Sequence, residues 1–424
     1  MSISWERYWR WLWMIAFING LVFSIRHIQT QQMEYFDYTV IHRPITIIII
    51  GLLIIPLIFK YKNVLLRRTF FLLTLFAVWQ IISVVWSDNK LWTSYRSLEF
   101  MVIAVLAAYT AAILNDSEGI KKWMNWVWGW YVILILTVWI GAILSPKNAF
   151  IQMPNATLPF MLNGVYPRMN ANTIAQISGI IAIVGFCRIL ERPRKQWVLL
   201  TFFGFATMVI AQGRSGLAAF LLSGLLVLIL LRRINILLGM LIIILVLAVT
   251  ANAFSLFYEF FRRGQSQQQL LGLTGRLFFW QYAWSNFIVT KPILGFGAYS
   301  GTRFLVMPQA TGVTTALSVH NTWIELLVNV GFVGTLIFII LIARLWLGLL
   351  RHAKYSDIRE YTFVAAEMIA VLSICILRSF FTANLAEHNQ YPLFLSLGVV
   401  HFLHTKVRVQ TSARGKSTVS AKEF

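Results

Sequence analysis

The sequence predicts an all-α, polytopic integral membrane protein with about twelve transmembrane helices and one long loop on the outer side of the membrane. The first observation is composition, because 58% of the 424 residues are hydrophobic and only 12% are charged, far from the mixture of soluble domains. The second is that apolar runs of about 20 residues, the length that crosses the hydrocarbon core, recur between polar breaks. The third is that clusters of Lys and Arg occupy alternate loops.

The apolar runs define the predicted spans. Two joints, at residues 212–214 and 232–233, are so short that the flanking helices are expected to form tight antiparallel pairs. The first run lacks a small-residue cleavage site and is therefore interpreted as a membrane helix, not a signal peptide. The spans are predicted at residues 8–25, 44–60, 68–86, 97–114, 123–144, 171–190, 196–212, 215–231, 233–251, 330–349, 361–380 and 390–404.

The basic residues orient the chain. Lys and Arg near short loops remain on the cytoplasmic side, which places both termini in the cytoplasm. The segments 26–43, 87–96, 145–170, 252–329 and 381–389 then face outward. The predicted organisation is transmembrane helices in 1–251, a catalytic outer loop with amphipathic helices in 252–329, further transmembrane helices in 330–404, and a basic cytoplasmic tail in 405–424. Residues 412–424 of this tail are expected to be disordered.

Several function classes are excluded. The net charge of +21 comes from short clusters between apolar runs, so membrane lipids and not nucleic acid are the expected surroundings. Cys187 and Cys375 lie inside apolar runs and suggest packing rather than a disulfide or a metal site. The chain has no His-x-x-His pair, acidic ligand triplet, P-loop or dinucleotide turn. A reaction without a metal or other cofactor is therefore expected.

The long outer loop holds the first candidate residue. Aromatic residues next to Arg262 and Arg263 predict a helix at the membrane interface. Further along, Thr274 is suited to cap a helix with Arg276 in its first turn. A helix N-terminus and a guanidinium together suit a phosphate, although an arginine that extends to lipid headgroups explains the local pattern equally well.

His320 is the candidate base. Thr322 and Glu325 have the spacing of a capping box, so His320 is expected just before a helix that returns into the membrane. A histidine near the positive end of a helix tends to stay neutral, which is the form that accepts a proton from a sugar hydroxyl. An isolated histidine is more often simply hydrogen-bonded at the interface.

Arg214 completes the predicted site. It lies in Gln212-Gly213-Arg214-Ser215-Gly216, a turn at the outward end of two spans, so counting helices places it on the same side as Arg276 and His320. A charged residue at a helix end can also simply extend to the interface. His388, followed by Asn389, competes with His320 for the role of base. The supporting candidates on this side are Arg168, Asn172, Asn321, Arg378 and His388.

These motifs resemble, in order and spacing, the superfamily of O-antigen ligases and O-antigen or exopolysaccharide polymerases. The resemblance covers most of the chain, and each motif is short, so its weight comes from their order. The motifs are Trp86-Ser87-Asp88-Asn89, Asn170-Ala171-Asn172, Gly213-Arg214-Ser215, Thr274-Gly275-Arg276 with Trp280, residues 291–297 (KPILGFG), and His320-Asn321 with Gly331 and Gly334.

The resemblance implies a GT-C-type glycosyltransferase of the bacterial inner membrane that acts at the periplasmic face. Such an enzyme takes a glycan from undecaprenyl diphosphate and passes it, with inversion and without a metal, to an acceptor hydroxyl. By resemblance, Arg214 and Arg276 hold the diphosphate and His320 is the base. The acceptor is lipid A core for a ligase or a second lipid-linked repeat for a polymerase, and the motifs do not separate the two.

Two other functions are weighed against this one. A protein O-glycan transferase belongs to the same superfamily, but the chain lacks a large outward domain at its C-terminal end. A flippase or transporter for lipid-linked glycan also has many spans and arginines that face phosphate. Against it, the sequence shows no matching halves, and charged residues are expected to be nearly absent from the middle of the spans.

Overall fold

The structure is a computed structural model, and it describes residues 5–22, 38–61, 63–153, 158–236, 275–312 and 318–420, with residues 238–239, 259–260 and 262 between them. Of these residues, 78% are helical. The predicted ninth span, the interfacial helix near Arg262 and the cap residue Thr274 lie wholly or mostly outside the described residues.

The first half of the described chain consists of α1 (Trp5–Val22), α2 (Tyr38–Lys60), α3 (Phe71–Ile82), α4 (Lys90–Ile113), α5 (Ser117–Leu144), α6 (Pro146–Ala149), β1 (Phe150–Gln152), β2 (Phe160–Leu162), α7 (Ala171–Glu191), α8 (Lys195–Ile210) and α9 (Arg214–Leu230). The second half consists of α13 (Arg276–Ala283), two π-helical segments (Trp284–Ile288 and Gly301–Val306), α14 (Met307–Thr311), α15 (Thr322–Tyr355), α16 (Arg359–Ser379) and α17 (Tyr391–Ser420). The two strands pair antiparallel, with Ile151 opposite Met161.

The chain is an all-α, multi-pass membrane protein. Among the described residues, six helices are long and apolar enough to cross a membrane: α2, α4, α5, α7, α15 and α16. Three shorter apolar helices, at 71–86, 195–210 and 214–230, accompany them. The predicted total of about twelve spans remains a prediction.

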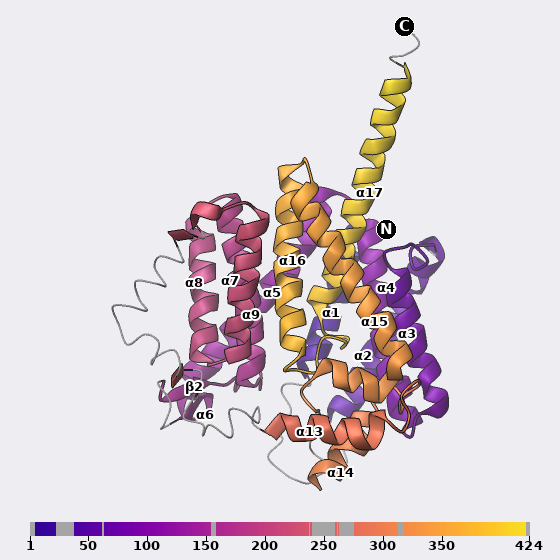
Figure 1. Cartoon of the computed structure of the whole chain (residues 1–424), viewed down its shortest axis with the longest axis vertical. Coiled ribbons are helices and arrows are strands. Elements are labelled where there is room, and N and C mark those ends of the chain that lie inside the picture. The colour runs from indigo at the N-terminus through magenta and orange to yellow at the C-terminus, as the bar shows by residue number, and fades with distance from the viewer. Residues whose placement is uncertain are drawn as a thin grey trace.

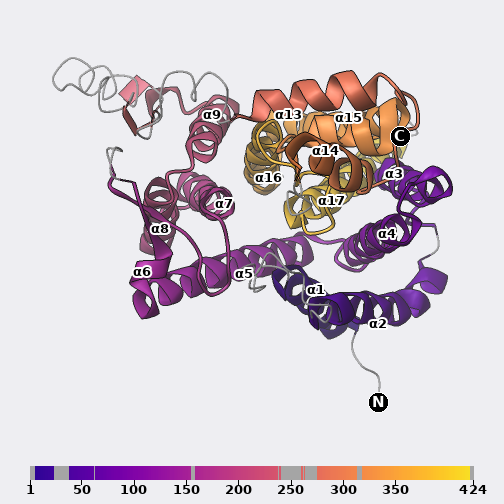
Figure 2. The same ribbon diagram turned by 90° about the horizontal axis from the view of Figure 1, so that it is seen from below.

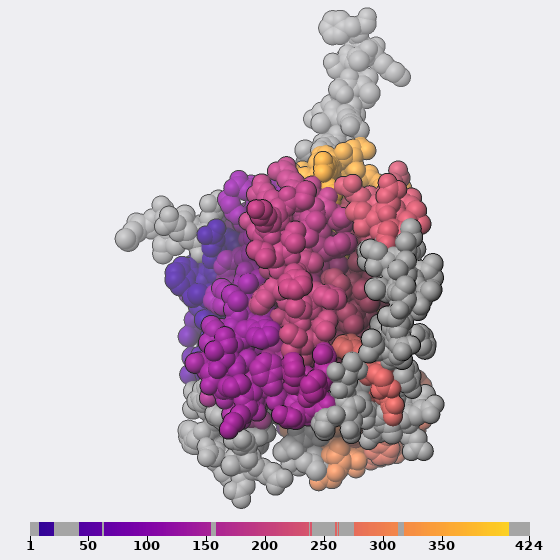
Figure 3. All heavy atoms as spheres, turned by 90° about the vertical axis from the view of Figure 1, so that its left-hand side faces the viewer, coloured from indigo at the N-terminus to yellow at the C-terminus, as the bar shows by residue number. Residues whose placement is uncertain are grey.

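The helices run mostly along one direction, and α13 and α14 lie across one end of them (Figure 1). We call this the lower end. The helices α7, α8 and α9 form one group, and α9 packs on α16 and α7. Figure 2, seen from below, places α9, α13 and α16 next to one another. Figure 3 shows the side of the molecule that α5 and the α7–α9 group cover.

The longest helix, α15, is interrupted at Gly331, where φ is 66° and ψ is −170°. The backbone N–H of Phe332 donates to the carbonyl of Pro292 at 2.8 Å, so residues 291–297 take up bonds that the break releases. A Cβ on Gly331 would lie 2.2 Å from the carbonyl oxygen of Ile293. The apolar pattern predicts a span only from residue 330, but the helix begins at Thr322, before the break at Gly331.

The end of the chain also differs from the sequence prediction. Helix α17 begins at Tyr391, close to the predicted residue 390, but continues to Ser420 instead of ending near 404. The prediction of a disordered tail is therefore wrong for residues 412–420. Figure 1 shows α17 extending beyond the upper end, away from α13 and α14.

Candidate active site

Four side chains that are distant in the sequence gather at the lower end. Arg214 is the first residue of α9, Arg276 is the first of α13, His320 directly precedes the α15 cap, and Arg378 lies in the last turn of α16. The charge of Arg276 acts on Arg214, His320 and Arg378, so all three lie near it. The structure thus brings together the residues that the sequence assigns to one site.

The turn before α9 is fixed by its neighbours. Gln212 has a left-handed backbone with φ of 50°, and its side-chain amide donates to the carbonyls of Leu158 and Phe160 at 3.0 and 2.7 Å. Gly213 packs so closely on α7 that a Cβ would lie 2.1 Å from that of Ala175. Gly213 is the N-cap and no side chain caps the helix; the N–H of Arg214 donates to the carbonyl of Gln212 at 3.1 Å, and the N–H groups that follow it in the first turn have no side-chain acceptor among the described residues.

Arg276 is held by the backbone of a distant loop. Its helix is preceded by Gly275, the N-cap residue, with φ of 84° and no side-chain cap; the sequence predicts a cap by Thr274, which is outside the described residues. The Nη1 atom of Arg276 donates to the carbonyl of Phe381 at 3.2 Å. Burial lowers the pKa of Arg276, and no carboxylate among the described residues forms an ion pair with it.

Hydrogen bonds on both sides hold the segment that carries His320. The backbone of His320 is left-handed, with φ of 57°, and its N–H donates to Oγ of Ser318 at 2.9 Å. On the other side, the Val319 N–H donates to Oε1 of Glu325 at 2.9 Å, and its carbonyl accepts from Nε1 of Trp280 at 2.9 Å. These bonds fix both the strained backbone and its position against α13.

The start of α15 corrects the predicted capping box. Asn321 is the N-cap, and its side chain accepts from the N–H groups of Trp323 and Ile324. The N–H and hydroxyl of Thr322 instead donate to the carbonyl of Thr382, at 3.0 and 2.8 Å. The Asn321 amide donates to the carbonyl of Phe380 at 3.2 Å. The helix start and Arg276 are therefore both bonded to residues 380–382.

His320 has the protonation state expected of a base. The residue as a whole is exposed, but partial burial of its ring and then the positive charge of Arg276 lower its pKa. An ordinary histidine titrates near about 6.5, so a lower pKa keeps the ring neutral at neutral pH. A neutral imidazole can accept a proton.

Arg378 is the most buried of the four side chains, with a relative exposure of 1%. Its Nε donates to Oε1 of Gln176 on α7 at 3.2 Å, and the same oxygen accepts from Asn384. Neither Nη1 nor Nη2 has a hydrogen-bond partner in the described parts of the chain. The guanidinium lies against the first turn of α9, since a Cβ on Gly216 would be 3.1 Å from Nη1.

The comparison with protein families identifies the region that carries most of this cluster. Residues 199–339 match the family model described as O-antigen ligase. This match confirms the resemblance to the O-antigen ligase and polymerase superfamily. The matched region contains Arg214, Arg276 and His320, and Arg378 follows it. No curated protein matches the chain.

His388, the rival base, belongs to a different cluster, outside the O-antigen ligase match. It is 4% exposed, and its Nδ1 lies 3.3 Å from Oε2 of Glu99. Arg43 pairs with Glu99 at 2.7 Å, and Arg96 pairs with both Glu99 and Glu387. We call these five residues the paired cluster, because each of its arginines has a carboxylate partner.

The paired cluster overturns one expectation. Charged residues are not confined to the ends of the spans, since Glu99 is the tenth residue of α4 and Glu367 is the ninth of α16. Glu367 pairs with Arg188 at 3.0 Å and accepts from Trp128. The only sequence feature that could have indicated these ion pairs is a single charged residue inside an apolar run. Its partner lies too far away in the sequence to be recognised.

The remaining candidates surround the start of α7. Arg168 is exposed in the turn that Gly164 and Met169 close by a β-bridge, and Asn172 is half-buried in the first turn of α7. The preceding Asn170 caps that helix by accepting from the Thr173 N–H at 2.8 Å. Among the described contacts, none joins Arg168 or Asn172 to the arginines and His320.

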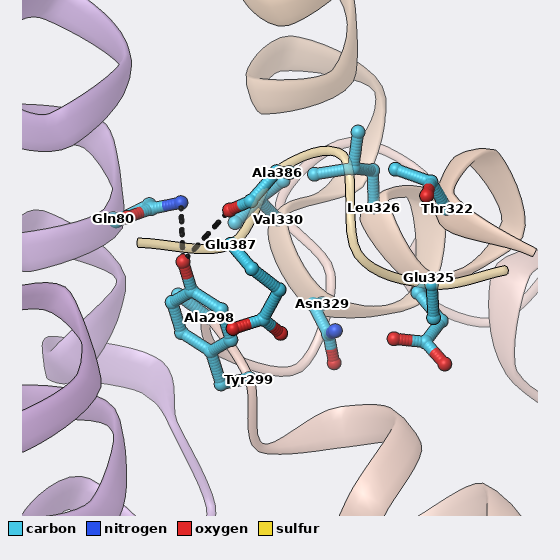
Figure 4. Close-up of a pocket in the computed structure, with 11 residues that line it drawn as sticks. Gln80, Ala298, Tyr299, Thr322, Glu325, Leu326, Asn329, Val330, Ala386 and Glu387 are labelled. Carbon is cyan, nitrogen blue, oxygen red and sulfur yellow. Dashed lines mark hydrogen bonds between the residues drawn. The ribbon is translucent and has the colours of Figure 1, made fainter. Parts of the chain in front are cut away.

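A small polar pocket of about 20 Å³ lies beside the start of α15. Thr322, Glu325 and Asn329 line it from α15, and Tyr299 and Glu387 complete it (Figure 4). The Tyr299 hydroxyl donates to the carbonyl of Ala386 at 3.0 Å. The pocket thus lies between the O-antigen ligase region and the paired cluster.

An apolar groove of about 540 Å³ lies between α9, α15 and α16. Leu226, Trp323, Trp346 and Leu377 are among its lining residues. Trp323 directly follows Thr322, and Leu377 directly precedes Arg378. One end of the groove therefore lies beside Arg378 and the start of α15.

Proposed function

We propose that the protein is an inverting, metal-independent glycosyltransferase that moves a glycan from undecaprenyl diphosphate to an acceptor hydroxyl at the periplasmic face of the bacterial inner membrane. The observation that carries this proposal is the gathering of Arg214, Arg276 and His320 next to an apolar groove. The match to the O-antigen ligase family supports the general class of enzyme.

The arginines suit the leaving group. As the bond between the anomeric carbon and the phosphate oxygen breaks, its electron pair stays with the lipid diphosphate, whose negative charge increases. Guanidinium groups form strong, charge-assisted hydrogen bonds with phosphate oxygens, and fixed cations in a partly buried site stabilise developing charge effectively. Arg276 has no carboxylate partner among the described residues, so its charge is not already neutralised by the protein.

His320 suits the acceptor. The acceptor oxygen forms the new bond to the anomeric carbon on the face opposite the diphosphate, which gives inversion. The hydroxyl proton passes to the neutral ring of His320. The low pKa of this histidine keeps the ring unprotonated and ready to accept it.

The apolar groove suits the lipid. It is lined by side chains from three helices of the membrane region and ends at Trp323 and Leu377. A polyprenyl chain in the groove would leave its diphosphate beside Arg276 and Arg378. The groove therefore supports a donor with an apolar tail, and the acceptor remains either lipid A core or a second lipid-linked repeat.

A flippase or transporter for lipid-linked glycan is the second candidate. The charged residues inside α4 and α16 favour it, because polar groups within spans often mark a translocation path. These charges, however, form ion pairs with 0% exposure at Glu99 and 8% at the Glu367 side chain. We place the enzyme first for this reason.

The decisive experiment is product formation by purified protein from undecaprenyl-diphosphate glycan in EDTA, with the two acceptors in separate tubes. The His320→Ala variant is expected to bind donor but form no product, whereas His388→Ala should retain turnover in the fraction that folds. Full turnover by His320→Ala would reject His320 as the base. Donor translocation without product in any tube would favour the transporter.

A further inference from the structure

Arg378 and Arg188 both contact α16 or lie on it, but they differ in whether a carboxylate balances the charge. Arg188 packs on the same helix and is neutralised by Glu367 at 3.0 Å. Arg378 is 1% exposed and has only one amide oxygen as acceptor, with no carboxylate partner in the described structure. A buried charge without a counter-ion is strongly destabilising. Such a charge is retained where a ligand supplies the missing negative group.

The position of Arg378 shows which group that is. Its Nη1 lies against Gly216, in the first turn of the 17-residue helix α9. That helix has no side-chain cap, and its N–H groups and dipole favour an anion. Arg214 starts the same helix, and the charge of Arg276 reaches both arginines. The helix terminus and the two Nη atoms of Arg378, which have no hydrogen-bond partner among the described residues, are independent features at one location.

We propose that Arg378 is the third cation of a diphosphate site at the N-terminus of α9, behind Arg214 and Arg276. The inference rests on the proposed function, since a lipid-linked diphosphate is the anion. In a poorly solvated environment the charge of Arg378 is weakly screened, so it acts on an anion bound at the N-terminus of α9. Binding of the diphosphate supplies the negative charge that the protein itself lacks there.

The test replaces Arg378 by methionine, which keeps much of the side-chain length without the charge. Wild-type and Arg378→Met protein in nanodiscs are titrated with undecaprenyl diphosphate while the unfolding temperature is followed. The variant is expected to unfold at a higher temperature without ligand, because the uncompensated charge is gone. Its affinity for the diphosphate is expected to be about 10- to 100-fold weaker.

Arg188→Met is the control, because it removes a half-buried arginine that does have a carboxylate partner. It should unfold at a lower temperature and keep the wild-type affinity. A third variant, Arg378→Lys, keeps the charge with fewer donors and should bind more tightly than Arg378→Met. This comparison decides the matter if Arg378→Met is itself destabilised: equal weakness of the two variants would overturn the proposal.

The outcomes separate this inference from the proposed function. If wild-type protein is not stabilised by undecaprenyl diphosphate, the proposed function fails. If wild type is stabilised and Arg378→Met binds equally well, only the role of Arg378 is rejected. A parallel titration with phosphatidylglycerol tests the other lipid source of phosphate, and an equal shift with that lipid would overturn the assignment to a diphosphate.

Discussion

Two groups of arginines contact the same segment, residues 380–390, and they differ in how their charge is balanced. Arg96 in the paired cluster reaches Glu387 and Glu99. Among the described residues, the side chain of Arg276 donates only to the carbonyl of Phe381, and that of Arg378 donates only to the amide oxygen of Gln176. The paired cluster is complete without a ligand. The arginines on the other side have donors and charge left for an anion, although both groups consist of the same residue type.

The difference shows why buried charge alone is a poor guide to function. An ion pair such as Arg43–Glu99 cancels its own field and fixes the packing of α2 on α4. An arginine without a carboxylate keeps its field and lowers the pKa of a nearby base, as Arg276 does for His320. The presence of a partner, rather than depth, separates the two groups.

The largest expected effect is on stability and concerns the paired cluster. Arg96→Gln leaves Glu387 without its cation and Glu99 with one fewer, and the loss should be about 3–5 kcal/mol, as for other broken buried pairs. Thermal unfolding in detergent measures it. The double variant Arg96→Gln/Glu387→Gln should recover part of the loss. Wild-type stability in the single variant would show that the pairing does not hold the fold.

The second-largest expected effect is on turnover and concerns Arg276. Arg276→Gln should lower the rate of product formation about 100- to 1,000-fold, as for loss of one donor that stabilises developing charge, with little change in unfolding temperature. Rates under saturating donor, beside circular dichroism of the same preparation, test both halves. If Arg276→Gln lost stability but kept its turnover per folded molecule, Arg276 would have a structural role like that of Arg96. The proposed difference between the two groups of arginines would then be wrong.

Local patterns in the sequence were sufficient to predict the start of α7 and the three main site residues. Helix α7 begins at Ala171, where its predicted span begins, because Asn170 caps an uninterrupted apolar run. Arg214, Arg276 and His320 were placed on one side of the membrane by counting helices. The capping-box spacing predicted a helix start directly after His320, where α15 begins, whereas the apolar run began only at residue 330 because Gly331 interrupts the helix.

Pairing between distant residues could not be predicted from one sequence. Arg43 and His388 are separated by 345 positions, and nothing in either local pattern names the other. The same limit explains why His388 competed with His320. Both are followed by asparagine at one end of a span, and only the neighbours, Glu99 for one and Arg276 for the other, distinguish them.

The smallest expected effect is the shift in the titration of His320. Burial and then Arg276 lower its pKa, so the neutral base is present above that pKa and is lost as the pH falls through it. Arg276→Gln should raise the pKa toward its ordinary value, by less than about one unit because burial is the larger cause. NMR titration of labelled histidines measures the pKa, with His320→Gln to assign the signal. Arg96→Gln should leave this titration unchanged, because its charge is already cancelled by carboxylates. Equal shifts in the two variants would mean that pairing does not confine the field of Arg96.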